Sequence, residues 1–220
     1  MPTLEKTRIA RKAAASSDAA ATSRDRRITR SRAALRRALV ELMEESGLEN
    51  VTVNDLCVRA GLTRATFYNH FADKDALLEA FEQEVLDDLT SFERRIGDYG
   101  MGNIMAHIVR KKPLPFLVDL FDYLRTQGDF LHAVLGIGGD VRFAPRLRDS
   151  LCTQLVESVL HAQYRDNPTP FVGYYVAFFA SAYLGVIMRW IETGMVETSE
   201  EMALISQRLL FIKPGESIKL

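Results

Sequence analysis

The sequence predicts an all-α protein in which an N-terminal three-helix head is joined to a larger helical body. Apolar residues recur at intervals of three and four from Leu35 onward, which is the spacing of one helix face. No run that alternates between apolar and polar residues, as a half-buried strand requires, exceeds a few residues. Gly and Pro divide the chain into segments of helical length, so we expect about nine or ten helices and no internal repeat.

Charge is distributed unevenly along the 220-residue chain, although its formal net charge is only −1. Residues 1–37 hold eleven Lys or Arg against three Asp or Glu, whereas the remainder holds 17 basic and 26 acidic residues. A basic end on an acidic body indicates that one end of the molecule meets a polyanion. A basic tail that only improves solubility would have the same composition.

The two cysteines, Cys57 and Cys152, lie far apart in the sequence and lack metal-ligand spacing. The sequence therefore predicts no disulfide framework, no metal site and no cofactor, and it fits a reducing, cytoplasmic location. The N-terminus has no apolar segment of the kind found in a signal peptide. A redox-sensing role for Cys152 is a weaker alternative, because nothing nearby in the sequence would lower its pKa.

We expect three regions along the chain. Residues 1–26 are rich in Ala, Ser, Thr, Lys and Arg and are predicted to form a disordered basic tail, because they have little apolar surface to bury. Residues 27–88 are assigned to the head and residues 89–220 to the body. In the body, helices are expected over 101–110, 114–126, 129–135, 145–162, 170–192 and 199–212.

Two short helices that meet at Gly61 indicate a helix-turn-helix. Thr52 can cap the first of them, and Thr63 can cap the second, whose inward residues are Phe67 and Phe71. A first helix that starts near residue 29 would brace the pair. In such a motif the second helix enters the major groove of DNA, with its N-terminal residues facing the base edges.

The second short helix presents polar side chains on the face opposite its phenylalanines. Arg64 is long enough to form two hydrogen bonds with guanine, and Ala65 or Thr66 suits a thymine methyl group. Residues farther along carry donors for phosphate oxygens, and the helix that begins after Thr52 attracts anions at its N-terminus. The predicted DNA-contacting set is Arg30, Thr52, Thr63, Arg64, Ala65, Thr66, Tyr68, Asn69, His70 and Lys74.

Some of these residues have a plain structural alternative. Tyr68 and His70 also suit an ordinary amphipathic surface. Arg30, together with Arg32, either reaches the DNA backbone or minor groove or is simply solvated.

The run from Val51 to Leu78, VTVNDLCVRAGLTRATFYNHFADKDALL, resembles the DNA-binding domain of the TetR family of bacterial transcriptional regulators. The matching features are the Thr before the second helix, Ala60-Gly61, Thr66, Phe67-Tyr68, His70-Phe71, Lys74 and Leu77. Cys57 and Asp75 depart mildly from the usual Ala and Glu. The resemblance implies a homodimer that binds a palindromic operator and is usually a repressor, with a helical effector-binding and dimerisation domain after the head.

The segment 170–192 is predicted to lie in a dimer core. It is apolar nearly all round, and it carries small residues every four positions, so a second helix can approach closely. Phe171 to Met188 also reaches the lower length limit of a membrane span, but the tyrosine and serine hydroxyls in its middle argue against lipid. The predicted dimer interface is Gly173, Ala177, Ser181, Leu184, Gly185, Met202, Ile205 and Leu209.

An effector pocket is expected between the helices of the body, where apolar and aromatic groups would surround a few polar ones. Each residue proposed for this pocket could instead be an ordinary core residue. The stretch from Trp190 onward, WIETGMVETSEEM, also resembles regulators of the dihydroxyacetone-kinase-operon type, some of which work through a protein partner. The candidate pocket residues are His107, Phe116, Tyr123, Phe130, His132, Phe143, Phe179 and Trp190.

The sequence therefore predicts a sequence-specific transcriptional regulator, in the first place a repressor released by an unknown small-molecule effector. The first alternative is a DNA-binding coactivator or adaptor controlled by a protein partner, and the second is a nonspecific nucleic-acid binder that uses the basic tail. An enzyme is not expected, because the sequence has no nucleophile elbow, Walker loop, zincin motif or CxxC pair. The Gly-rich stretch 136–140 follows a helical pattern and not a strand, so it is not expected to hold phosphate.

Overall fold

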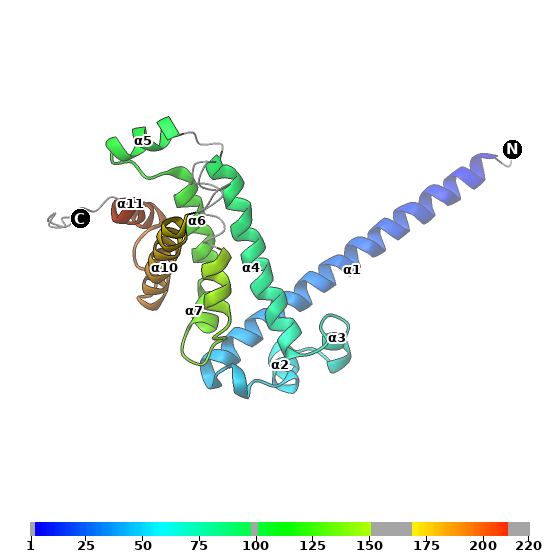
Figure 1. Ribbon diagram of the computed structural model, residues 1–220. Helices are drawn as coiled ribbons and strands as arrows, with labels where there is room; N and C mark the ends of the chain where they lie inside the picture. Colours follow the sequence, from blue (N-terminus) through cyan, green and yellow to red (C-terminus); the bar gives the residue numbers. More distant parts are fainter. Residues whose placement is uncertain (1–2, 98–100, 151–168, 211–220) are drawn as a thin grey trace.

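The computed structural model describes residues 3–97, 101–150 and 169–210, and this part of the chain is built of helices without a strand, as predicted. Figure 1 shows a small group of helices at one end of the molecule and a larger group at the other. The helices are α1 (Thr3–Ser46), η1 (Leu48–Asn50), α2 (Val53–Ala60), α3 (Arg64–Tyr68), α4 (Lys74–Gly97), α5 (Met101–Val109), α6 (Pro115–Thr126), α7 (Gly128–Leu135), α10 (Pro170–Glu192) and α11 (Ser199–Leu210).

Helix α1 is longer than the sequence analysis predicted. It begins at Thr3, so residues 3–26, which were expected to be disordered, continue the helix of the head. The reason is local: residues 3–46 contain no Gly or Pro, and Ala, Lys and Arg favour the helix. Figure 1 shows the N-terminal part of α1 projecting away from the rest of the molecule.

The head consists of α1, α2 and α3, packed around residues that the helical spacing had marked as apolar. Leu35 and Leu39 of α1, Leu56 of α2 and Phe67 of α3 are all fully buried. Arg59 of α2 forms an ion pair with Glu45 of α1, with 2.7 Å between Nη2 and Oε2. The head is thus a closed three-helix unit that fixes the orientation of its shortest helix.

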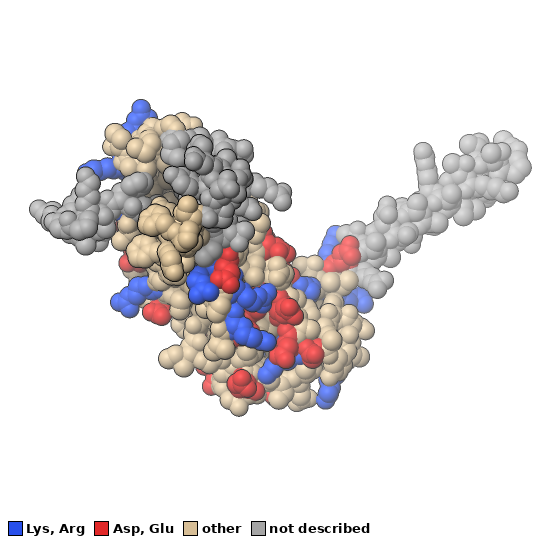
Figure 2. All heavy atoms as spheres, in the orientation of Figure 1, with Lys and Arg blue, Asp and Glu red and all other residues tan. Residues whose placement is uncertain are grey.

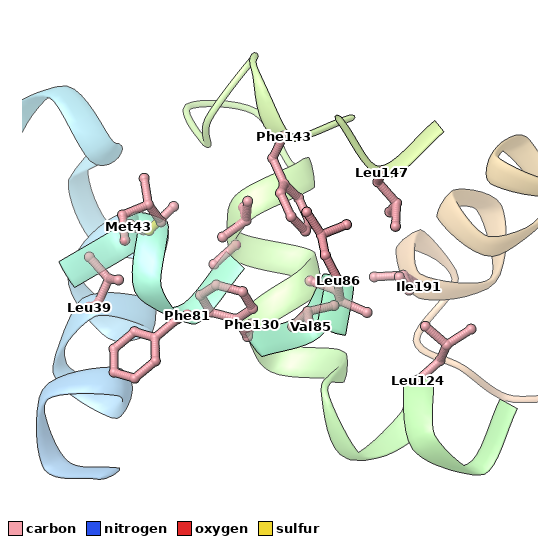
Figure 3. Packing of buried hydrophobic residues seen from close by; sticks show 14 of the residues in the cluster. Leu39, Met43, Phe81, Val85, Leu86, Leu124, Phe130, Phe143, Leu147 and Ile191 are labelled. Carbon is pink, nitrogen blue, oxygen red and sulfur yellow. The ribbon is translucent and has the colours of Figure 1, made fainter. Parts of the chain in front are cut away.

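Helix α4 connects the head to the body (Figure 1). The ring of Phe81 on this helix lies 5.9 Å from Phe71 in the head and 6.3 Å from Phe130 in α7, measured between centroids. Figure 3 shows Phe81 and Phe130 beside Leu39 and Met43 of α1. The buried side chains of the head and the body therefore form one continuous core, and a displacement of either part must repack it.

In the body, α11 packs against α6, and α10 packs against α7. Trp190 of α10 is buried and meets Phe121 of α6 edge to face, with 5.4 Å between the ring centroids. Gln207 of α11 accepts a hydrogen bond from the amide of Leu114 at 2.8 Å and donates one to the carbonyl of Lys112 at 3.2 Å. The predicted helix over 145–162 begins at residue 143 and is described as far as 150.

Candidate DNA-binding interface

Thr52 caps the start of α2 as predicted, and with Asp55 it forms a capping box. The hydroxyl of Thr52 accepts a hydrogen bond from the amide of Asp55 at 3.2 Å, and the Asp55 carboxylate accepts one from the amide of Thr52. This reciprocal pair satisfies two of the amides that a helix start leaves unpaired. Thr52 itself is exposed at the positive end of the helix, as a phosphate contact requires.

The turn between α2 and α3 depends on Gly61. Its φ of 65° and ψ of 34° lie in the left-handed region, and it ends α2. The amide of the next residue, Leu62, donates to the carbonyl of Cys57 at 2.9 Å and closes the turn. A residue with a Cβ would be strained here, so the angle between the two helices follows from one glycine.

Helix α3 is very short, and two features of its sequence hold it in place. The hydroxyl of Thr63 accepts a hydrogen bond from the amide of Thr66 at 3.1 Å and lies 2.9 Å from the Thr66 hydroxyl. Phe67 is completely buried and meets Phe71 with 6.0 Å between ring centroids. One face of the helix is anchored in the head, so the opposite face must point outward.

The outward face of α3 carries the residues predicted to read DNA. Arg64 and Ala65 are exposed at its N-terminal end, and Tyr68 is half exposed at its C-terminal end. Among the described residues Arg64 contacts Tyr68: its Nη2 lies at a long hydrogen-bond distance of 3.4 Å from the hydroxyl, and its guanidinium is 6.0 Å from the ring centroid. The guanidinium is therefore held weakly and is available to a partner. Thr66 is partly covered, and the predicted Asn69 is exposed as the C-cap residue.

Lys74 is placed differently from the other predicted phosphate contacts. Its ammonium donates a hydrogen bond to the carbonyl of Leu48 at 2.8 Å and is half buried. Lys74 therefore ties the start of α4 to the turn after α1, and only its remaining N–H groups are available for phosphate. His70 is also half buried, with its ring 6.1 Å from that of Phe71.

The two arginines considered at the start of the head have different environments. Arg30 is exposed on α1, beside Arg26 and Arg27. Arg32 forms an ion pair with Glu84 of α4, and its guanidinium lies 5.1 Å from the ring centroid of Phe71. Arg30 can thus serve a polyanion, whereas Arg32 braces α1 against α4.

Cys57 lies in the core of the head and 4% of its surface is exposed. Burial raises the pKa of its thiol, so it behaves as a small apolar residue. Cys152 lies outside the described residues. The described part of the chain has no group of three side chains able to hold a metal ion.

The aromatic residues predicted to line an effector pocket fall into two groups. Phe130, Phe143 and Trp190 are buried members of the hydrophobic core or pack against it, and Phe130 also lines a cleft. Figure 3 shows Phe143 against Leu86 of α4. The partly exposed group consists of His107, Phe116, Tyr123 and Phe179.

His132, the remaining pocket candidate, lies in an open cleft between the head and the body. Its Nδ1 atom is 2.6 Å from a carboxylate oxygen of Glu44 on α1. The cleft has a volume of about 710 Å³ and is lined mainly by charged groups of α1 and polar groups of α7 and the preceding turn. Arg36 also lines it, with its guanidinium 4.5 Å from the ring centroid of Phe130. No sequence pattern indicates this junction, because His132 and Glu44 are 88 residues apart in the chain.

The predicted dimer residues also divide into two groups. Gly173, Ala177, Ser181 and Gly185 lie on the exposed face of α10, and Leu209 is exposed on α11. Leu184 and Met202 are buried within the protomer, because they pack toward the body. They therefore do not lie on the free face, where they had been predicted. Ile205 is partly buried.

The exposed face of α10 carries large aromatic side chains in addition to the small ones. Phe171 is 74% exposed, Tyr174 79% and Phe178 68%. Figure 2 shows much of the surface over α10 without charged side chains, whereas acidic and basic side chains mix across the middle of the molecule. By length and hydropathy, α10 is the one helix among the described residues that could cross a membrane, a property that core helices share.

Comparisons with known proteins agree with this architecture. A family model described as "Bacterial regulatory proteins, tetR family" matches residues 35–81, which cover the last part of α1, all of α2 and α3, and the first part of α4. A second one, described as "Transcriptional regulator C-terminal region", matches residues 111–211 of the body.

Two curated proteins of Bacillus subtilis (strain 168) resemble short parts of the chain. The HTH-type transcriptional regulator YxbF is 37% identical over 71 residues, which are 30% of this chain and 19% of the relative. The HTH-type transcriptional regulator YvdT is 35% identical over 49 residues, or 22% of this chain and 25% of the relative. These matches therefore span only about a fifth and a quarter of the relatives' own lengths.

Solved structures share the fold over most of the chain. FadR from Bacillus halodurans, a fatty acid degradation regulator, has a TM-score of 0.60 at 15% identity, covering 84% of this chain and 97% of its own. The dihydroxyacetone kinase operon activator DhaS has a TM-score of 0.51 at 20% identity and coverages of 82% and 93%. A TetR regulator from Streptococcus agalactiae 2603V has a TM-score of 0.50 at 21% identity and coverages of 86% and 98%.

Two family models thus account for the head and for most of the body, and the helix-turn-helix has the geometry that DNA recognition requires. The chain belongs to the TetR family of bacterial transcriptional regulators.

Proposed function

We propose that the protein is a cytoplasmic, homodimeric repressor that binds a palindromic operator and is released from it by a small-molecule effector. Members of the family bind DNA and act as dimers. The observation that carries the proposal is the exposed N-terminal end of α3, where Arg64 is held by one long hydrogen bond while Phe67 anchors the opposite face. Such a helix presents side chains to base edges without further rearrangement.

The exposed face of α10 supports the dimer. Phe171, Tyr174 and Phe178 expose a contiguous apolar surface, which soluble proteins normally cover with a partner. The small residues Ala177 and Ser181 on the same face would let the second α10 approach closely. A two-fold pair built in this way would hold two α3 helices about 34 Å apart, which is one turn of DNA.

Release by an effector follows from the continuous core between the head and the body. An effector that binds more tightly to one arrangement of the body would change the spacing of the two heads. The free energy of operator binding would weaken by the difference between the effector's binding free energies for the released and the operator-binding arrangements. The cleft beside His132 and Arg36 lies at that junction and is open to a small polar molecule. We place the effector-sensitive part of the protein there and in the adjoining helices of the body.

Selection of bound duplexes from a random pool tests the proposed DNA recognition. We expect enrichment of one sequence with two inverted half-sites whose centres are about 10 base pairs apart. Binding without enrichment would instead support the nonspecific nucleic-acid binder. In a reporter with the selected site over a promoter, the protein should lower expression, and small-molecule fractions of cell extract should restore it. Raised expression would contradict the assignment as a repressor.

Phe178→Arg tests the dimer surface. The substitution places a charge on the exposed face of α10, so we expect a folded monomer by sedimentation and a large loss of operator affinity. Val196→Arg is the matched control, because Val196 is 79% exposed but lies outside α10. A Phe178→Arg protein that remained a dimer would place the interface elsewhere. Recovery of the wild-type protein only from membranes would show that α10 faces lipid.

A further inference from the structure

The loop Gly136–Asp140, which follows α7, contacts the head through its backbone. The amide of Leu48, just after α1, donates a hydrogen bond to the carbonyl of Gly138 at 2.8 Å. A Cβ built on Gly138 would lie 3.2 Å from the Cα atom of Gly47, and both glycines have positive φ, of 86° and 77°. The two backbones meet this closely because neither has a side chain at the contact.

The same residue of the head is held from a second side. The carbonyl of Leu48 accepts the hydrogen bond from Lys74 at the start of α4. The peptide groups on either side of Leu48 therefore connect the head to the loop of the body and to the connecting helix. This is a position where a small movement of the loop would shift the head.

The inner end of the loop lies at two buried carboxylates that pair with more exposed arginines. Asp140 is 6% exposed, and its carboxylate accepts hydrogen bonds from the guanidinium of Arg142 at 2.9 to 3.2 Å. Glu82 of α4 is 1% exposed, and its Oε2 atom accepts a hydrogen bond from Arg146 at 2.6 Å. Its second oxygen, Oε1, is buried and has no donor among the described residues.

A proton on Glu82 accounts for this arrangement. In the protonated carboxyl, Oε1 would donate to Asp140 while Oε2 still accepts from Arg146. Burial, and next the charge of Asp140, raises the pKa of Glu82 to about 7. Although burial opposes it, the hydrogen bonds from Arg142 keep the pKa of Asp140 below its usual value. Two neighbouring carboxyls with pKa values moved apart in this way are typical of a pair that shares one proton.

We propose that Glu82 and Asp140 share one proton, and that this proton holds the loop Gly136–Asp140 against the head and so makes operator affinity depend on pH. Below neutrality the shared proton links α4 to the loop, and the loop keeps the head in a fixed position. Above neutrality two carboxylates face each other, the loop separates from α4, and the contact between Gly138 and Leu48 weakens. Because a fixed head binds with less loss of freedom, operator affinity falls as the pH rises.

The groups around this pair define what else could titrate with it. Arg142 and Arg146 act on Glu82 from the loop and the following helix, and Asp75 of α4 acts on Arg142. Around the adjacent Phe81, α1 contributes the guanidinium groups of Arg32 and Arg36, each 5.5 Å from the ring centroid, beside apolar side chains of α1 and α7. The other titratable pair at the junction is His132 with Glu44. It lies on the cleft side, so it is tested by a variant of its own.

Operator affinity measured from pH 6 to pH 8.5 at constant ionic strength tests the proposal. We expect the wild-type operator affinity to fall about tenfold, which corresponds to a difference of one unit between the pKa of the shared proton in the free and in the DNA-bound protein. Glu82→Gln keeps a donor toward Asp140 at every pH, so its affinity should stay high and vary little. Glu79→Gln, on the exposed side of α4, and His132→Asn should keep the wild-type profile. A wild-type profile in Glu82→Gln would overturn the proposal, and loss of the profile in His132→Asn would assign it to the histidine.

Hydrogen exchange gives a readout that a purely structural role of Glu82 would not change. After correction for the intrinsic rate, protection of the Leu48 amide in the wild-type protein should fall as the pH rises from 6 to 8.5, while that of Leu39 in the core of the head stays constant. Equal changes at both amides would indicate global destabilisation and would overturn the proposal. The inference rests only on the family's DNA binding, so a flat pH profile with intact operator binding would leave the proposed repressor function standing.

Discussion

Arg64→Ala is the substitution that tests most directly how α3 reads DNA. The side chain is exposed and makes one long hydrogen bond, 3.4 Å to the Tyr68 hydroxyl. Its removal should therefore change the free energy of unfolding by less than about 0.5 kcal/mol. A guanidinium that forms two hydrogen bonds to guanine contributes about 1–3 kcal/mol of discrimination against the wrong base. The expected loss at the preferred operator is then about 5- to 150-fold.

The assay is fluorescence anisotropy with the selected operator and with duplexes that carry each substitution at the half-site positions. In the Arg64→Ala protein one position should lose its base preference, while the other positions keep theirs. Arg30→Ala is the matched control, since Arg30 is an exposed arginine on α1 that belongs to the predicted DNA-contacting set. It should weaken all duplexes alike and make the salt dependence less steep. Uniform weakening by Arg64→Ala, with every base preference retained, would refute the placement of Arg64 at a base edge.

Three further predictions concern the scaffold that holds the site. Phe67→Ala should lower the free energy of unfolding by about 3–5 kcal/mol, because it empties a fully buried position, and a change below about 1 kcal/mol in urea unfolding would contradict this. Gln207→Leu leaves the Leu114 amide unpaired and should cost about 1–3 kcal/mol in the same assay, and no loss would mean that water replaces the partner. The pKa of Glu82 is about 7 in the folded protein, above its ordinary value of 4.5, so folding takes up a proton at pH values between 4.5 and about 7. The melting temperature should therefore fall as the pH rises from 5 to 8. Glu82→Gln should flatten this slope, and an unchanged slope would assign it to other groups.

The head was predictable from the sequence because its determinants are local. Thr52 and Thr63 cap their helices, Gly61 makes the turn and Phe67 turns inward, each through contacts within a few residues along the chain. Such patterns fix both the helix bounds and the face that points outward. The helices of the body followed equally well from Gly and Pro positions, since α6, α7 and α10 begin within one residue of the expected starts.

The errors also have a physical origin. The N-terminal segment was expected to be disordered from its low apolar content, but without Gly or Pro it continues α1. Leu184 and Met202 have the spacing of an interface, yet they pack inside the protomer, because periodicity marks an apolar face without showing what covers it. For the same reason the sequence pattern did not distinguish a core position from a pocket position for Phe143 and Trp190.

The sequence by itself determined the helices, the fold class and the outward face of the short helix α3, because these depend on contacts between near neighbours in the chain. Only the tertiary structure decided how the head is held. It brought Gly138 against Gly47, and it placed Asp140 beside Glu82, across separations of more than 50 residues. Such contacts leave no periodic signal, since their energy depends on burial and on the charges that folding brings together.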